Sequence, residues 1–168
     1  MEFRKTTIED INQIMSIFKQ AQQYFKDNHI DQWQNNYPNI QTIKDDMQNG
    51  YSYVLLKDGI PVATAAISFD GEKTYKEIYN GKWLSDGEYA VIHRLAVDQQ
   101  HKGQGISSEV MKIIEKMCID KGINNIKIDT HEQNLPMQKL LLKNDFTYCG
   151  VIFLEDGNKR IAFEKQIN

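Results

Sequence analysis

Apolar residues recur at three- and four-residue steps in four stretches of the chain, and each stretch predicts a helix. The first runs from Thr7, a candidate N-cap, to about Lys26, and residues 40–49 predict a second helix that ends at Gly50. A third helix begins near Ile106, and the fourth spans about residues 134–143. The apolar stripe of the first helix comprises Ile11, Ile14, Met15, Phe18, Ala21 and Phe25, and that of the third comprises Val110, Ile113, Ile114 and Met117.

Between the helices, short apolar runs have the length of strands. Residues 51–56 and 60–69 flank an Asp-Gly pair, and residues 146–154 and 160–165 flank another, so both pairs of runs predict hairpins. A βαβ unit over residues 88–129 should have parallel strands and a right-handed crossover. With a short first strand at the N-terminus, the prediction is an α/β (α+β mixed) fold. It has a central mixed, mostly antiparallel sheet with a parallel βαβ core and helices on both faces.

Composition and charge agree with one domain over residues 1–168. Charged residues make up 26% of the chain and hydrophobic residues 40%, while the net charge of -3 argues against a nucleic-acid partner that needs a basic surface. The N-terminus lacks a signal peptide's apolar segment, and no apolar run approaches the roughly 20 residues that span a bilayer. We therefore expect a cytoplasmic protein without a membrane partner, and a homodimer stays open.

The cysteines and histidines show no metal-binding pattern. Cys118 and Cys149 lack the spacing of metal ligands, and the four histidines are not spaced as a helical pair, so we predict no metal. Cys118 fits a core position on the third helix. A nucleophilic Cys149 would need a paired base, and no such pattern surrounds it.

The junction over residues 91–108 joins an apolar strand to a polar loop and then to the start of the third helix. The first turn of a helix has unpaired N–H groups and the positive end of the helix dipole. Gly103 and Gly105 allow the backbone to approach a ligand closely. This junction therefore predicts a site for an anion such as a phosphate.

Three other interpretations of the glycine pair differ in their spacing. A Walker loop needs a Gly-Lys-Ser/Thr string that the chain lacks. A dinucleotide fingerprint needs a third glycine where Ser108 stands and normally follows the first strand of its domain, although Asp129 lies at about the right distance to bind a ribose. The third interpretation is an ordinary strand-to-helix turn that binds nothing.

Two motifs resemble one known family. The string Gln100-His101-Lys102-Gly103-Gln104-Gly105 resembles the Gln/Arg-x-x-Gly-x-Gly/Ala motif of the GCN5-related N-acetyltransferases (GNAT), and a Leu-Ala-Val strand end precedes it as in that family. Near the C-terminus, the family pattern of Asn, Ala, Tyr, Gly and Phe falls on Asn134, Met137, Leu141, Asp145 and Phe146. The predicted element order is that of the family, so the resemblance, to a small bacterial-type member, covers nearly the whole chain.

This resemblance implies an enzyme that transfers an acetyl group from acetyl-CoA to a primary amine of a small molecule or peptide, by direct attack in a ternary complex. It implies that the pantetheine arm pairs with Leu95, Ala96 and Val97. Near the C-terminal pattern, Asn134 and Leu141 are further cofactor contacts. The pyrophosphate is expected on Gln100, His101, Lys102, Gly103, Gln104, Gly105, Ile106, Ser107 and Ser108.

Leu141 stands where the family usually has the tyrosine that protonates the departing thiolate, and leucine donates no proton. Short polar residues such as Asp145 can replace the family glycine, because they tolerate the left-handed conformation. The alternative function is a catalytically silent CoA-binding sensor or scaffold of the same fold.

Acetyl transfer needs a neutral amine, and an alkylamine near pKa 10 is protonated at pH 7, so a base or a water chain is required. His93 is the first candidate, because its ordinary pKa suits this task and arylalkylamine acetyltransferases have a histidine at the corresponding place; the alternative is a structural histidine. Glu88 is the second candidate, against a solvated strand-end charge. His131 could reach the acetyl end, unless Asp129 or Thr130 simply caps the next helix.

For the departing thiolate, Tyr148 or water is a candidate proton donor, or the thiolate leaves unassisted. The acceptor is expected to contact Asp31, Gln32, Trp33 and Tyr37 together with residues 70–87, since these irregular stretches lie outside the family-like core. Aromatic and acidic side chains there suit a cationic amine. The alternative is that both loops are packed by their own aromatic side chains.

Overall fold

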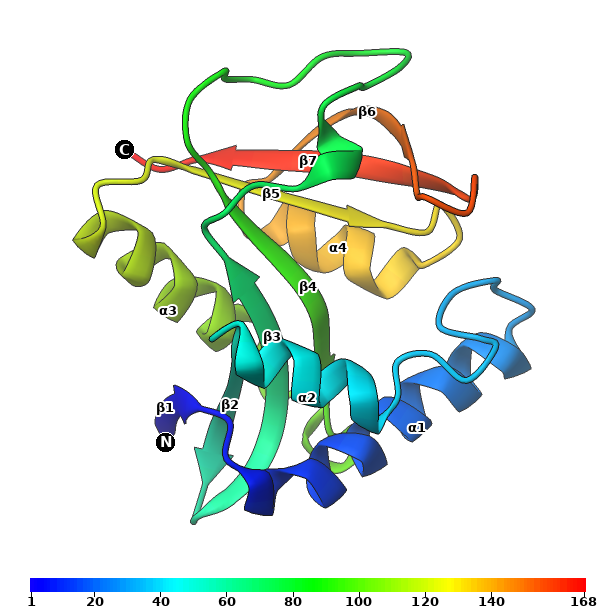
Figure 1. The fold of residues 1–168 in the computed structure, drawn as a ribbon, viewed down its shortest axis with the longest axis vertical. Coiled ribbons are helices and arrows are strands. Elements are labelled where there is room, and N and C mark those ends of the chain that lie inside the picture. The colour runs from blue at the N-terminus through cyan, green and yellow to red at the C-terminus, as the bar shows by residue number, and fades with distance from the viewer. The chain divides into compact units, whose positions relative to one another are not determined.

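The computed structural model describes residues 1–168 and contains four α-helices and a mixed seven-stranded sheet (Figure 1). The strand order is β1-β2-β3-β4-β5-β7-β6. The helices are α1 (Ile11–Asp27), α2 (Ile40–Gln48), α3 (Ile106–Asp120) and α4 (Leu135–Lys143). The strands are β1 (Glu2–Lys5), β2 (Ser52–Lys57), β3 (Ile60–Ser68), β4 (Ala90–Val97), β5 (Asn125–Thr130), β6 (Thr147–Phe153) and β7 (Lys159–Gln166). The predicted element order and fold class are confirmed.

The chain divides into two compact units, and β4 and α3 each contribute to both. Unit 1 comprises residues 1–67 and 93–110, and unit 2 comprises residues 68–92 and 111–168. The expectation of a single domain stays a prediction. None of the helices has the length and apolar character that crossing a membrane would require.

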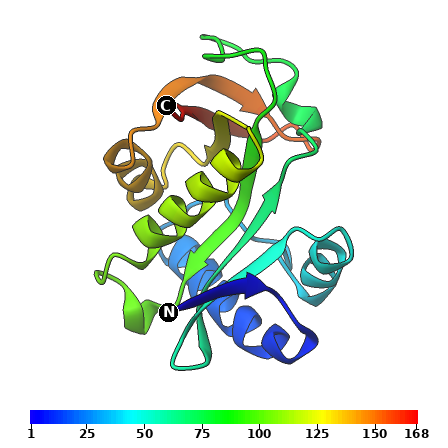
Figure 2. The same cartoon turned by 90° about the vertical axis from the view of Figure 1, so that its left-hand side faces the viewer.

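In unit 1, β1, β2 and β3 pair antiparallel (Figure 2). The predicted Asp-Gly turn joins β2 to β3, and its residues Asp58 and Gly59 both have left-handed φ angles, 52° and 77°, as a two-residue hairpin loop requires. Helices α1 and α2 pack with strand β2 around one core, because their apolar residues lie in a single buried cluster. Its members include Ile14, Ile17, Phe18, Ile43 and Val54.

The predicted first helix is two elements. Thr7 precedes a 3-10 turn, η1 (Ile8–Asp10), and α1 starts only after it. The Asp10 carboxylate accepts hydrogen bonds from the Thr7 N–H at 2.8 Å and from both ends of the Arg4 guanidinium at 2.7 and 3.1 Å. These bonds hold Asp10, which is buried, between β1 and the start of the helix.

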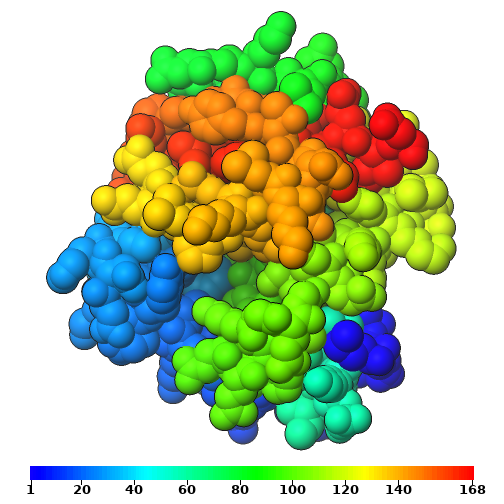
Figure 3. All heavy atoms as spheres, turned by 180° about the vertical axis from the view of Figure 1, so that it is seen from behind, coloured from blue at the N-terminus to red at the C-terminus, as the bar shows by residue number.

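In unit 2, β5 pairs parallel with β4 and antiparallel with β7, and β6 pairs antiparallel with β7. The parallel pairing joins Ala90 to Ile126 and Val91 to Lys127, which confirms the predicted parallel βαβ unit. Residues 70–87 contain only one short 3-10 turn, η2 (Lys73–Tyr75), and they lie against β6 in Figure 3. The fully buried Glu164 of β7 accepts hydrogen bonds from the Leu84 N–H at 2.9 Å and the Ser85 hydroxyl at 2.5 Å, so it holds this segment in place.

Candidate functional site: a glycine loop after a bent strand

The second half of β4 is interrupted by a residue in the left-handed conformation. Arg94 has a φ of 53°, which is unusual for a non-glycine residue inside a strand and bends the backbone there. Its guanidinium donates two hydrogen bonds to the carboxylate of Asp46 and one to the hydroxyl of Tyr37. Leu95 and Ala96 follow the bend and are buried.

After β4 the chain enters the glycine loop, residues 98–105, which contains the 3-10 turn η3 (Gln99–His101). Asp98 fixes the start of this loop, because its N–H donates to Val62 of β3 at 2.8 Å and its carboxylate accepts from the Gln100 N–H at 3.1 Å. The Gln99 N–H donates to the Gln20 side chain of α1 at 2.8 Å. The loop is therefore held on both β3 and α1, within unit 1.

Both glycines of the loop have backbone angles that favour glycine. Gly103 and Gly105 have φ values of 79° and 76°, and a Cβ atom added to either would meet no protein atom within 4 Å. Conformation, not crowding by other protein atoms, therefore accounts for the two glycines. A Cβ at either position would project into space that no other protein atom occupies.

The helix that follows starts immediately after this pair. Its first hydrogen bond runs from the Glu109 N–H to the Gly105 carbonyl at 3.0 Å, so the N–H groups from Ile106 to Ser108 precede the helical ladder. These N–H groups and the helix dipole suit an anion. The arrangement fits the pyrophosphate of a CoA molecule.

Two side chains of the loop add positive or protonatable groups. Lys102 is exposed, and its ammonium lies 5.5 Å from the ring centre of Tyr24. The Nδ1 atom of His101 is buried without a hydrogen-bond partner and lies 4.0 Å from a carboxylate oxygen of Asp98.

The predicted proton-transfer residues occupy different parts of the structure. His93 is half-buried on β4 in unit 1, whereas Glu88 is exposed in unit 2. In the loop after β5, the Nδ1 atom of His131 accepts a hydrogen bond from the Gln133 N–H at 3.0 Å. Tyr148 is 49% exposed on β6, and its ring packs edge-on against Phe163. Their roles in proton transfer stay predictions.

The start and end of α4 show what the second family pattern does in this chain. The expectation that Asp129 or Thr130 caps this helix is wrong, because Asn134 is the N-cap and accepts a hydrogen bond from the Met137 N–H. Asn134 also donates to the Thr130 hydroxyl at 3.2 Å. After the helix, Asp145 has the predicted left-handed φ, 67°.

The carboxylate of Asp129 already has a hydrogen-bond partner within the protein, which argues against the interpretation of Asp129 as a ribose ligand. Its carboxylate accepts a hydrogen bond of 2.6 Å from the hydroxyl of Tyr75, which is buried. Burial, together with the nearby charge of Asp129, raises the pKa of Tyr75 well above its ordinary value. Tyr75 therefore stays protonated and keeps donating this bond. Trp83 in turn donates to the Tyr75 carbonyl, so Asp129 anchors the segment 70–87.

Residues 28–39 contain the predicted acceptor contacts Asp31, Gln32, Trp33 and Tyr37, and we call this stretch the predicted acceptor segment. Its aromatic side chains differ in exposure. Trp33 is half-buried and packs edge-on against Phe18 and Phe25, which agrees with a loop packed by its own aromatics. Tyr37 is 42% exposed and receives the hydrogen bond from Arg94. Asp31 is exposed. Tyr37 and Asp31 thus present polar groups at the surface.

Neither cysteine has the properties of a nucleophile. Cys118 and Cys149 are buried, and burial raises the pKa of each thiol to about 11. Both therefore stay protonated at neutral pH, whereas a nucleophilic cysteine needs the thiolate. The structure contains no group of three or more His, Cys, Asp or Glu side chains placed to hold a metal ion.

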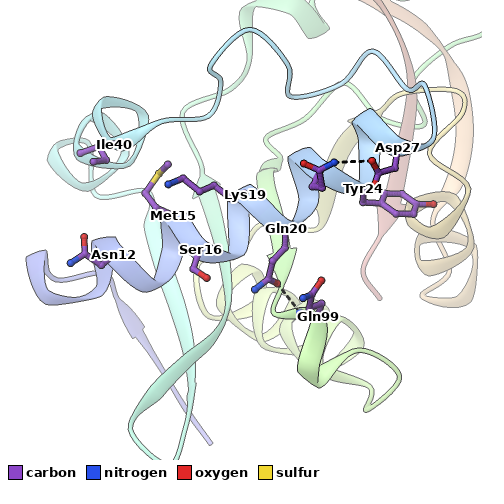
Figure 4. A pocket seen from close by; sticks show the side chains of 10 residues that line it. Asn12, Met15, Ser16, Lys19, Gln20, Tyr24, Asp27, Ile40 and Gln99 are labelled. Carbon is purple, nitrogen blue, oxygen red and sulfur yellow. Dashed lines mark hydrogen bonds between the residues drawn. The ribbon is translucent and has the colours of Figure 1, made fainter.

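A groove of about 790 Å³ runs along the polar face of α1, beside the glycine loop (Figure 4). Successive turns of α1 contribute Asn12, Ser16 and Gln20, and Gln99 closes one side through its bond to Gln20. Sequence reasoning did not find this groove, because it considered only the apolar face of the helix. The contact between Arg94, Asp46 and Tyr37 was missed as well, since no pattern links these distant positions.

Comparison with known proteins identifies the family to which the chain belongs. Residues 12–146 match the model of the acetyltransferase (GNAT) family, so the chain belongs to that family. A GNAT-family acetyltransferase from Streptococcus agalactiae 2603 has a similar structure, with 33% sequence identity and a TM-score of 0.88. The match covers 99% of this chain and 95% of that chain.

Two curated relatives are more distant. The S-alkylcysteine N-acetyltransferase of Bacillus subtilis (strain 168) is 25% identical over 117 residues, and the streptothricin acetyltransferase of Escherichia coli is 26% identical over 82 residues. The alignments cover 70% and 49% of this chain, but only 60% and 45% of the relatives. The chain therefore spans about half the length of the curated relatives that it matches.

Proposed function

We propose that this protein is a cytoplasmic N-acetyltransferase that transfers an acetyl group from acetyl-CoA to a primary amine of a small molecule or peptide. Family membership supports the use of acetyl-CoA. Within the structure, the proposal rests on the glycine loop. Gly103 and Gly105 both have left-handed φ angles, and the first turn of α3 follows Gly105 directly.

In this proposal the chain's own backbone holds the cosubstrate. N–H groups between Gln100 and Ser108 bind the pyrophosphate, and the segment from Leu95 to Val97 pairs with the pantetheine arm. A backbone N–H at Leu95 or Val97 polarises the thioester carbonyl and stabilises the negative charge that develops on its oxygen. Holding both reactants in one orientation supplies much of the acceleration in reactions of this type.

Starting from its ammonium form, the acceptor nitrogen must lose two protons, and the departing thiolate must gain one. His93 takes the proton from the ammonium group of the acceptor, directly or through water, and the amine nitrogen then attacks the thioester carbon. The carbon–sulfur bond breaks, the thiolate leaves with the bonding electrons, and the nitrogen loses its second proton to water. Leu141 is completely buried and has no proton to donate, so Tyr148 or water protonates the thiolate.

For the acceptor, we propose contacts with the exposed residues Asp31 and Tyr37, and with any part of Trp33 that its packing leaves accessible. An acidic and an aromatic side chain suit an amine that arrives as a cation. The names of the two curated relatives place S-alkylcysteine and streptothricin first among the amines to test. Peptides with a free N-terminus form the second group.

One observation favours a second function. Leu141 stands where the family pattern has its proton-donating tyrosine, and its complete burial leaves no proton donor at this position. A chain without a general acid could bind CoA as a sensor or scaffold and transfer nothing. The enzyme and the sensor predict the same affinity for CoA and differ only in turnover.

The experiment that separates them measures thiol release from acetyl-CoA with the amine panel, alongside CoA affinity by titration calorimetry. The proposal predicts binding and amine-dependent release of thiol, with an acetylated product of the expected mass. Tight binding without turnover on any amine would favour the sensor. Absence of CoA binding would contradict both functions.

A further inference from the structure

The left-handed residue in β4 is held by side chains that are far from it in sequence. The guanidinium of Arg94 donates from Nε and Nη2 to the two carboxylate oxygens of Asp46, at 2.8 and 2.7 Å, and from Nη1 to the hydroxyl of Tyr37 at 2.9 Å. Asp46 belongs to α2, whereas Tyr37 belongs to the segment before it. We call these three residues the arginine clamp.

Within the clamp, the pair formed by Arg94 and Asp46 is largely removed from water. The side chains of Arg94 and Asp46 are only 16% and 13% exposed. Burial alone would lower the pKa of Arg94, but the adjacent Tyr37 and Asp46 outweigh it and raise that pKa. The planar guanidinium binds both carboxylate oxygens at once. This two-point pairing fixes the orientation of the two side chains as well as the distance between them.

Each end of the clamp is attached to a part of the proposed site. At one end the Arg94 backbone bends the strand directly before Leu95, whose N–H is a candidate to polarise the thioester. At the other end Tyr37 lies in residues 28–39, the predicted acceptor segment. That segment is fixed locally as well, because Gln22 donates to the Pro38 carbonyl and Asn39 caps α2.

We propose that Arg94 is a positioning residue for acetyl transfer. Through Asp46 it fixes the bend of β4, and through Tyr37 it ties the acceptor segment to that strand, so that amine and thioester are aligned together. This inference rests on the proposed function and adds to it a residue that touches neither the pyrophosphate loop nor the reacting atoms. Small displacements of reacting groups lower rates strongly, which makes such a constraint measurable.

The test compares kcat, KM and CoA affinity of wild type with Arg94→Ala, Asp46→Asn and Tyr37→Phe. We expect Arg94→Ala and Asp46→Asn each to lower kcat by about ten-fold or more, while CoA affinity changes less than about two-fold, because the glycine loop is intact. Since both remove the same clamp, the double variant should lose little more than either single one. Tyr37→Phe should raise KM for the amine with a smaller effect on kcat.

Arg4 and Asp10 provide a matched control within the same unit. They also form a two-pronged arginine–carboxylate pair, at 2.7 and 3.1 Å, but they join β1 to the start of α1. Arg4→Ala should lower the melting temperature as Arg94→Ala does and leave kcat within about two-fold of wild type. Equal kcat losses in the two variants, or none in either, would overturn the proposal.

Two further measurements cover a variant that folds poorly and a chain without turnover. Arg94→Gly accepts the left-handed backbone at no steric cost but lacks the clamp, so wild-type kcat in this variant would overturn the proposal. Hydrogen exchange needs no substrate: Asp46→Asn should speed amide exchange in residues 28–39 and 91–98 together, and unchanged exchange there would also overturn it. A wild type that binds CoA without turnover would instead contradict the proposed function, and with it the role of the clamp in transfer.

Discussion

Replacing Gly103 by alanine tests the glycine loop, with Gly122→Ala as its matched control. Both glycines have left-handed φ angles, 79° and 70°, and in both a new Cβ atom would meet no protein atom within 4 Å. The cost to the fold is therefore the conformational cost alone, about 1 kcal/mol for each. For a chain of this size, that cost lowers the melting temperature by about 2–4 °C.

The two variants should differ in CoA affinity. Gly122 follows the C-terminal end of α3, a helix of 15 residues and hence about 22 Å long, whereas Gly103 lies before its N-terminal end. A methyl group at residue 103 would keep the pyrophosphate from the backbone N–H groups. Losing one or two charge-assisted hydrogen bonds costs about 2–4 kcal/mol, which weakens binding by about 30-fold or more.

Titration calorimetry with CoA and thermal unfolding of both variants measure these quantities. We expect equal melting temperatures within about 2 °C, with unchanged affinity in Gly122→Ala and a loss of at least about 30-fold in Gly103→Ala. Equal affinity in the two variants would refute the assignment of the loop to the pyrophosphate. Gly103→Val should abolish binding altogether.

Three further predictions concern His93, Asp10 and Glu164. His93→Ala should lower kcat at neutral pH by about 100-fold or more and remove the acidic limb of the pH-rate profile; an unchanged profile would exclude His93 as the base. Burial alone would raise the pKa of Asp10, but the hydrogen bonds and charge of Arg4 and Thr7 outweigh burial and lower it. The stability that Asp10 confers is therefore complete above about pH 4, the range of its unfolded pKa, and is lost as the pH falls through its folded pKa. Asp10→Asn should therefore unfold about 2 kcal/mol more easily in urea at pH 7, with a gap that closes in acid; a constant gap would contradict this. Glu164→Gln should speed amide exchange of residues 80–87, and unaltered exchange would show that Glu164 does not hold that segment.

Local patterns sufficed for most of the fold. The apolar stripes of α1 and α3 and the Asp-Gly turn at Asp58 are properties of neighbouring residues, and the structure confirms them. The left-handed φ at Asp145 follows from the same kind of reasoning, because short polar side chains tolerate that conformation. These features need no knowledge of distant contacts.

The features that sequence reasoning missed depend on distant contacts. Arg94 lies in a sequence typical of a strand, so its left-handed backbone is not apparent from its neighbours. Its side chain bonds to Asp46 and Tyr37, and these contacts are visible only in the structure. Likewise, the sequence suggests Asp129 as a ribose ligand or a helix cap, whereas in the structure Tyr75, 54 positions away, donates a hydrogen bond to it. Pairings of this kind leave no periodic trace in a single sequence.

The candidate site was predicted to a similar extent. The spacing of Gly103 and Gly105 located the loop, since a short motif carries its own backbone requirement. The helix cap was assigned to the wrong residues, because Asp129, Thr130 and Asn134 all have suitable side chains and only the backbone path selects Asn134. The identity of the proton donor for the thiolate is ambiguous in the same way, because the buried Leu141 cannot donate a proton and no sequence pattern selects another residue.

A crystal structure of the protein with bound CoA tests the central claim most directly. The account predicts the pyrophosphate within hydrogen-bonding distance of backbone N–H groups between Gln100 and Ser108, beside Gly103 and Gly105. It also predicts the pantetheine arm along Leu95 to Val97, directly after the bend at Arg94. A CoA molecule bound with its pyrophosphate away from this loop would contradict the account.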